Sequence, residues 1–161
     1  MRTPRLFSTV LLLVVTALAI AGVRPVTAAA QAAPRYRPPV AGIVVDRFRP
    51  PLRPYGPGNL GIDYRTQPDA VVVASAAGVV TFAGRVGIDL FVVIAHADGL
   101  RTTYGSLRSA SVVAGTAVLA GQAIGTSGSL MHFGVRRGPT YLDPERLLRG
   151  GQLRPRLVPN R

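Results

Sequence analysis

Few side chains in this 161-residue sequence can do acid–base or metal chemistry, since it contains two histidines, seven carboxylates and no cysteine. One of the histidines, His132, lies in the stretch LMHFGVRR (130–137), in which apolar residues occupy every second position. Such alternation is typical of a β-strand with one buried face. His132 is out of phase with the apolar residues, and we therefore expect its imidazole on the face opposite the core.

The stretch NLGIDYR (59–65) has the same pattern, and its Asp63 is out of phase with Ile62 and Tyr64. If the two strands are neighbours, Asp63 and His132 meet on one surface, where they could bind a metal ion or hydrogen-bond to each other. The pattern leaves another interpretation open, in which Asp63 is solvated and His132 bonds to the backbone. The other histidine, His96, is interpreted as structural.

The elements that would position these residues are short strands. A tight ADG turn (97–99) joins two of them, because Gly99 can adopt a positive φ. The one strong helix signal is DPERLL (143–148), with Asp143 as N-cap and Pro144 at the first helical position. The sequence predicts an all-β domain of two packed antiparallel sheets with a short C-terminal helix. Stretches rich in β-branched and aromatic residues predict strands at 42–48, 60–66, 70–76, 78–86, 90–96, 100–107 and 130–137.

Four segments are expected along the chain. Residues 1–32 combine early arginines, an apolar run and small residues near Ala30 and Ala32, which predicts a secretory signal peptide and a secreted or cell-envelope location. A retained membrane anchor is the alternative. Residues 33–42 are predicted to be a Pro/Arg linker, 43–148 the folded domain and 149–161 a basic tail.

The charge of the chain is one-sided, with 19 arginines, no lysine and seven acidic residues. Without the signal peptide, which carries three of the arginines, the net charge is +9. Such a field favours acidic partners. Outside the cell these would be anionic wall polymers, peptidoglycan carboxylates or lipid headgroups, and export counts against nucleic acid. A solubility preference or genomic composition is the other explanation of the arginine excess.

Six motifs occur in an order that resembles the LytM/lysostaphin-type zinc metallopeptidases, which cut peptides of bacterial cell walls. The resemblance covers about residues 56–148 and implies the duplicated-hybrid-motif fold of peptidoglycan hydrolases. It also implies a zinc site made by a His and an Asp four residues apart and by the second His of a His-x-His strand. Two more histidines act on the water and the oxyanion. The motifs are GNLGIDYRT, VVVASAAGVVTFAG, FVVIAHADGLRTTYGSL, VVAGTAVLAGQAIGTSG, LMHFGVRRG and YLDPERLL.

Carried over by position, the resemblance puts the metal ligands at Asn59, Asp63 and His132, and the two catalytic histidines at Ser106 and Leu130. Three of the five positions have therefore lost an imidazole. An amide oxygen is a poor replacement for imidazole at zinc, and a single general base is worth about 10²- to 10⁴-fold in rate. We expect a vestigial site, with no cofactor or with weakly bound zinc.

Degenerate relatives of this type imply binding or regulation. The expected partners are peptidoglycan or an acidic cell-wall polymer, or a cell-wall amidase or other envelope protein. Arginine forks and aromatic faces suit such ligands. One alternative is an active zinc metalloendopeptidase that cleaves peptidoglycan peptides. Another is an envelope-tethering protein that binds through its basic tail. The residues expected to line the groove are Tyr55, Arg65, Tyr104 and Arg136.

Overall fold

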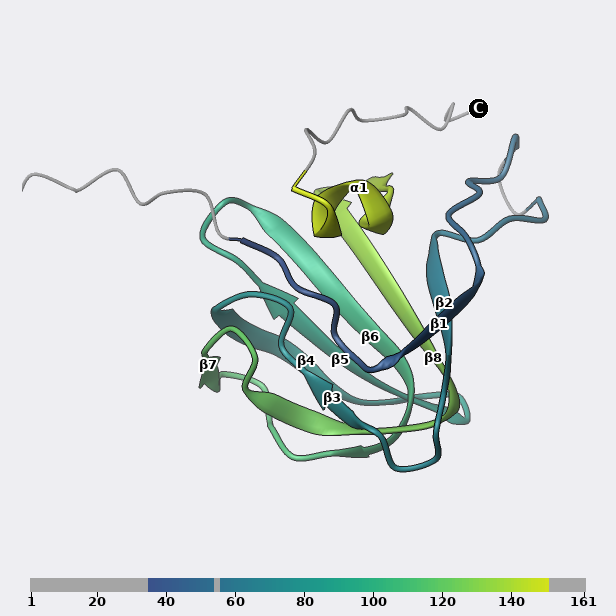
Figure 1. Cartoon of the computed structure of the whole chain (residues 1–161). Helices are drawn as coiled ribbons and strands as arrows, with labels where there is room; N and C mark the ends of the chain where they lie inside the picture. The colour runs from purple at the N-terminus through teal and green to yellow at the C-terminus, as the bar shows by residue number, and fades with distance from the viewer. Residues whose placement is uncertain (1–34, 54–55, 151–161) are drawn as a thin grey trace, which may run out of the picture. The chain divides into compact units, whose positions relative to one another are not determined.

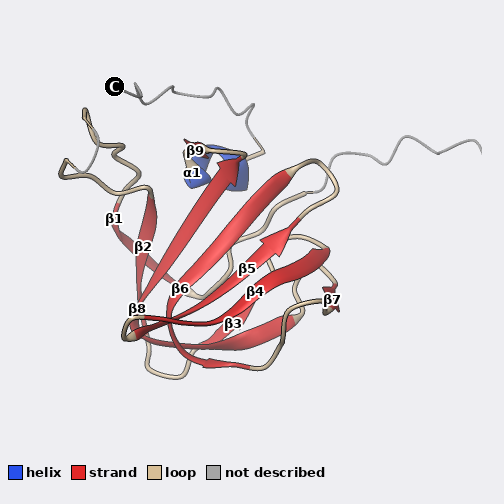
Figure 2. Cartoon of the chain, turned by 180° about the vertical axis from the view of Figure 1, so that it is seen from behind, coloured by secondary structure: helices blue, strands red, loops and turns tan. Residues whose placement is uncertain are grey.

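The computed structural model describes residues 35–53 and 56–150. In this part nine antiparallel strands form one sheet in the order β1-β2-β8-β6-β5-β4-β7, and β3 and β9 also pair with β8 (Figure 1). The predicted all-β fold with a short C-terminal helix is confirmed (Figure 2). The elements are β1 (Gly42–Asp46), β2 (Gly61–Thr66), β3 (Val71–Val73), β4 (Gly78–Val86), β5 (Asp89–Ala95), β6 (Leu100–Ala110), β7 (Ala117–Val118), β8 (Ala123–Arg137), β9 (Thr140–Leu142) and α1 (Pro144–Leu148).

The longest strand, β8, organises the sheet. Its first part pairs with β3 and its second part with β2, while β6 runs along its other edge. The strands β6 and β8 pair with each other from Leu100 and Arg137 to Ala110 and Gly125. The two sheets expected from the sequence are therefore joined in one hydrogen-bonded network. The sequence analysis did not predict the first half of β8, because the stretch 123–129 is rich in small and polar residues and lacks an alternating pattern.

The core lies on the face of the sheet that the strand phases predict. On β8 the side chains of Met131, Phe133 and Val135 are buried, as are Ile62 and Tyr64 on β2. Burial of each large apolar side chain contributes about 1.5–3 kcal/mol. Burial of these apolar side chains on the core side therefore fixes the positions of His132 and Asp63 on the opposite face.

Residues 36–40 pack against the core, which differs from the linker expected over 33–42. Tyr36 and Val40 are buried, and the segment crosses one face of the sheet (Figure 1). The ring of Tyr36 stands edge-on to His96, with 5.1 Å between the ring centroids. Its hydroxyl donates to the carboxylate of Asp98 at 3.0 Å. The folded unit therefore includes most of the Pro/Arg segment.

The buried histidine, His96, is bonded on both ring nitrogens. Its Nδ1 lies 2.8 Å from the carbonyl oxygen of Ala77, so this nitrogen carries the proton and donates. Its Nε2 lies 2.8 Å from the hydroxyl of Thr102, which can donate to it. Burial lowers the pKa of His96, and this effect outweighs the opposing ones of the Ala77 carbonyl and Asp98. His96 is thus a neutral structural residue, as expected.

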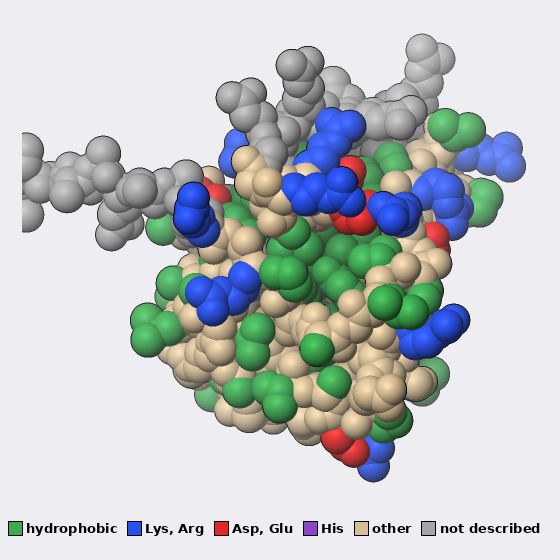
Figure 3. All heavy atoms as spheres, viewed as in Figure 1, with side chains coloured by type: hydrophobic (Ala, Val, Ile, Leu, Met, Phe, Trp, Pro, Cys, Tyr) green, Lys and Arg blue, Asp and Glu red, His purple; other side chains and the backbone are tan. Residues whose placement is uncertain are grey.

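The C-terminal helix α1 begins as predicted. The side chain of Asp143 accepts a hydrogen bond from the backbone N–H of Glu145 at 3.0 Å. Glu145 also lies 2.6 Å from Arg47, and Asp143 lies 3.5 Å from Arg146. Figure 3 shows arginine side chains gathered around acidic ones on this side of the domain. Such exposed pairs contribute little each.

No helix within 35–53 and 56–150 is long and apolar enough to cross a membrane. The predicted signal peptide lies outside these residues, and so does nearly all of the predicted basic tail. Both segments therefore remain predictions from the sequence.

The low pKa of His96 gives a pH dependence of stability. In the unfolded chain the pKa of a histidine is about 6.5, whereas that of folded His96 is lower. Below about pH 6.5 the unfolded chain binds a proton that the folded chain does not, so stability falls as the pH falls. Urea unfolding at pH 7.5 and pH 5.5 should show a larger loss for the wild type than for His96→Gln. Equal losses would contradict this assignment.

Candidate functional site

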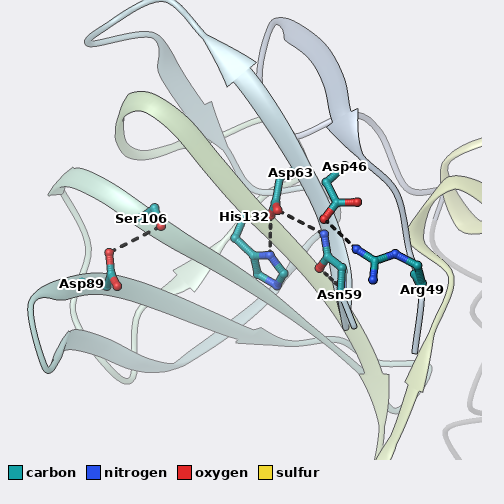
Figure 4. A network of polar contacts seen from close by, with 8 residues as sticks. Asp46, Arg49, Asn59, Asp63, Asp89, Ser106 and His132 are labelled. Carbon is teal, nitrogen blue, oxygen red and sulfur yellow. Dashed lines mark hydrogen bonds and ion pairs between the residues drawn. The ribbon is translucent and has the colours of Figure 1, made fainter. Parts of the chain in front are cut away.

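Asp63 and His132 meet on the face opposite the core. The two residues are directly opposite each other in the β2–β8 pairing, and 2.7 Å separates Asp63 Oδ1 from His132 Nδ1 (Figure 4). A carboxylate oxygen only accepts, so Nδ1 is the donor. About a third of each side chain is exposed, 33% for Asp63 and 30% for His132. The pair is therefore within reach of a ligand.

Asn59 completes this cluster from the segment before β2. Its Nδ2 donates to Asp63 Oδ2 at 3.1 Å, and its Oδ1 accepts from the backbone N–H of Gly61 at 3.0 Å. Only the amide oxygen can accept from an N–H, so the bond to Gly61 fixes the orientation of the amide. Asn59 is 7% exposed, and two backbone hydrogen bonds join it to Arg49.

The polar side-chain atoms of Asp63 and Asn59, and Nδ1 of His132, all have hydrogen-bond partners. Both oxygens of Asp63 accept hydrogen bonds, Nδ1 of His132 donates one, and the oxygen of Asn59 is held by the backbone. Within the described ranges, no group of three His, Cys, Asp or Glu side chains is placed to hold a metal ion. Zinc sites use three or four imidazole, thiolate or carboxylate ligands. One imidazole, one carboxylate and a bonded amide oxygen do not fit that set.

Glycines form the floor on which His132 rests. A Cβ added to Gly61 would lie 2.7 Å from His132 Nε2, so the imidazole lies directly against this backbone. A Cβ added to Gly105, the β6 residue opposite His132, would lie 2.6 Å from the ring of Phe91. The ring of Phe91 therefore covers Gly105 beside the imidazole. Sequence analysis did not identify Phe91, because the stretch 90–95 is apolar at every position and gives no alternating pattern.

The two positions matched to catalytic histidines hold no group that replaces them. Ser106 follows Gly105 at an irregularity of β6 and has a φ of 54°, which is uncommon for a residue with a side chain. Its hydroxyl lies 3.5 Å from Asp89 and points away from His132 (Figure 4). Leu130 is 50% exposed, and its aliphatic side chain cannot transfer a proton.

Two of the residues expected to line a groove lie on the face of the site. Arg65 is exposed and two residues beyond Asp63 on β2, and Arg136 is half-buried and four residues beyond His132 on β8. Both therefore share the outer face of the sheet. Tyr55 lies outside the described residues.

Tyr104 belongs to the core, contrary to its expected place in the groove. The side chain is fully buried, and its hydroxyl accepts from the backbone N–H of Ser75 at 2.8 Å. Burial raises the pKa of Tyr104 to about 12. The alternation in the stretch 100–107 puts Tyr104 in phase with Leu100, so the strand pattern already contained the signal for its burial.

A comparison with sequence families agrees with this geometry. The profile of Peptidase family M23 matches residues 57–144. An uncharacterized protein of Mycobacterium tuberculosis is 32% identical over 130 residues, which cover 73% of this chain and 51% of that protein. The chain thus spans about half the length of the curated relatives it matches.

Solved structures share the fold. Lysostaphin of Staphylococcus simulans matches with 26% identity and a TM-score of 0.59, over 68% of this chain and 51% of lysostaphin. A chain of the SpoIIIAH and SpoIIQ complex matches with 27% identity and a TM-score of 0.62, over 69% and 98%. A catalytic-domain mutant of the prophage-encoded M23 protein EnpA from Enterococcus faecalis matches with 26% identity and a TM-score of 0.55, over 70% and 95%. Since the family profile matches more than half of the sequence, this chain belongs to peptidase family M23, in its LytM/lysostaphin type.

Proposed function

We propose that this domain is a catalytically inactive M23 domain that binds the cell wall or an envelope protein. The observation that carries the proposal is the position of Asn59. Its amide N–H donates to the carboxylate of Asp63, and its amide oxygen accepts from the backbone N–H of Gly61. To use His132 Nδ1, a metal would have to displace its proton and break the bond to Asp63, and the oxygens of Asp63 and Asn59 already accept hydrogen bonds.

The loss of acid–base groups supports the same conclusion. Ser106 and Leu130 stand where the family places its two catalytic histidines, and neither can act as a base near neutral pH. A missing general base costs about 10²- to 10⁴-fold in rate, and a missing oxyanion donor costs about 10²- to 10³-fold. The hydrogen-bonded cluster of Asn59, Asp63 and His132 remains, and it can orient a bound ligand.

The charge of the domain supports an acidic ligand. The described residues hold 13 arginines and all seven acidic residues of the chain. Peptidoglycan carboxylates and acidic wall polymers fit this charge, and the predicted signal peptide would bring the protein to them. The likeness to a chain crystallised in the SpoIIIAH and SpoIIQ complex supports an envelope protein, such as a wall amidase, as the other class of partner.

The first prediction of this proposal concerns zinc and turnover. The purified protein, incubated with zinc and then desalted, should retain well under one equivalent by elemental analysis, and should not release fragments from peptidoglycan. The triple variant Asn59→His/Ser106→His/Leu130→His restores the family residues and should retain more zinc than the wild type. One equivalent of zinc together with cleavage by the wild type would establish the active peptidase instead.

Asn59 should also stabilise the fold. Asn59→Ala leaves the buried N–H of Gly61 without an acceptor and Asp63 without one donor, so the free energy of unfolding should fall by about 1–3 kcal/mol. Urea unfolding measures this loss. The matched control is Ser106→Ala, whose partner is exposed and 3.5 Å away, and it should stay within about 0.5 kcal/mol of wild type. Equal stability of Asn59→Ala and wild type would show that the hydrogen bonds of Asn59 do not stabilise the fold.

Salt separates binding by the domain from binding by the basic tail. Exposed charges are screened beyond about 8–10 Å near physiological ionic strength, so wall binding by residues 149–161 alone should disappear at high salt. Binding by the face that carries Asp63 and His132 should weaken less, because half-buried groups such as Arg136 and the Asp63–His132 pair are screened less than exposed ones. Sedimentation with purified peptidoglycan, for the full chain and for a chain ending at residue 148, at 50 mM and 500 mM NaCl, measures the difference. Complete loss of binding upon truncation would favour the tethering alternative.

A further inference from the structure

Two arginines lie side by side at one end of the face that carries the site. Arg101 on β6 is directly opposite Arg136 on β8, and such residues have their Cβ atoms about 4.5–5.5 Å apart on the same face. Arg101 is exposed and Arg136 is half-buried. Tyr141 on β9 is opposite Arg136 on its other side. Like charges in this arrangement repel each other, so an anion between them would be favoured.

Among the described residues, no carboxylate is paired with these arginines. All seven acidic side chains lie within the described residues, and each has another partner. Five of them are paired with other basic residues, Asp98 accepts from Tyr36 and from the N–H of Leu100, and Asp89 is near Ser106. The five are Asp46, Asp63, Asp69, Asp143 and Glu145, whose partners are Arg49, His132, Arg108, Arg146 and Arg47. The charge of Arg101 and Arg136 is thus left for a ligand.

The surface between the arginines and the site has small side chains. Arg136 is four residues beyond His132 on the same strand, or about 13 Å. Between them lies Gly134, which is opposite Gly61 on β2 and Thr103 on β6. Beside Thr103 lies Val93 of β5. A ligand in extended conformation could therefore lie across Gly134 and reach both the arginines and the Asp63–His132 pair.

We propose that Arg101 and Arg136 bind the carboxylate of an extended peptide whose chain lies across Gly134 toward Asp63 and His132. Two guanidinium groups provide planar, paired donors that match a carboxylate. The apolar side chain of Val93, which is opposite Thr103, favours a peptide over a phosphate-rich wall polymer. The inference rests on the proposed function, because it names the chemistry that the binding face recognises. The carboxylate has two sources, the stem peptide of peptidoglycan and an acidic side chain of a partner protein.

The test is binding of defined peptides to the full chain by calorimetry. The probes are a synthetic peptidoglycan stem tetrapeptide with free carboxylates, the same peptide with its carboxylates amidated, and a linear Ala/Glu tetrapeptide of L-residues. Amidation should weaken binding about tenfold or more, since hydrogen bonds to charged groups are the strong ones. Arg101→Gln and Arg136→Gln should each cause a similar loss with the free probe and almost none with the amidated probe. Tighter binding of the stem peptide identifies the wall as the source, and tighter binding of the L-peptide identifies a protein.

The matched control is Arg53→Gln/Arg85→Gln, which removes the same charge as the double variant Arg101→Gln/Arg136→Gln. Arg85 is opposite Leu90, on the other side of the sheet from the site, and Arg53 lies in the loop before β2. The control should bind the free probe like the wild type, and the melting temperature of the Arg101/Arg136 double variant should not fall. Equal losses in both double variants, or equal affinity for free and amidated probes, would overturn the inference and leave the proposed function standing. Absence of binding to all probes and to intact peptidoglycan would overturn the inference together with the wall-binding part of the proposed function.

Discussion

The hydrogen bond between Asp63 and His132 depends on the register of β2 against β8. Side chains on a strand alternate between faces, so a slip by one residue would move both groups into the core and their apolar neighbours to the surface. The pairing of Ile62 with Phe133 in the core prevents such a slip. The geometry of the site is therefore set by hydrophobic burial on the other side of the same two strands.

Asn59 changes the chemistry of that geometry without changing the fold. A histidine at this position would offer a lone pair to a cation, whereas the amide offers an N–H to the carboxylate of Asp63. The carboxylate is thus stabilised by two hydrogen-bond donors where a zinc peptidase would stabilise it with a metal. Because an unsatisfied buried polar group is costly, the backbone N–H of Gly61 holds the amide oxygen and keeps the arrangement in place.

The sequence was sufficient to predict features that depend on local patterns. The phases of the stretches 59–65 and 130–137 placed Asp63 and His132 each opposite the core, and the Asp143 cap placed the helix. That the two strands are neighbours was an expectation from the family resemblance. The partners of Asn59 could not be predicted, because the bond to Gly61 depends on how the chain turns before β2. Tyr36 was assigned to a linker because its surroundings are rich in Pro and Arg, and only the long-range contact with His96 and Asp98 makes it part of the fold.

The distribution of charge follows from the same sheet. Acidic side chains are few, and in the described part of the chain none of them forms an ion pair with Arg101 or Arg136. The pleat then decides which arginines share a surface, since Arg136 must face the same way as His132, and Arg101 must stand beside it. A positive site at a fixed distance from the Asp63–His132 pair is thus a consequence of strand register. A scaffold that can align metal ligands is equally suited to align arginines, because either task needs only that side chains on neighbouring strands keep their places.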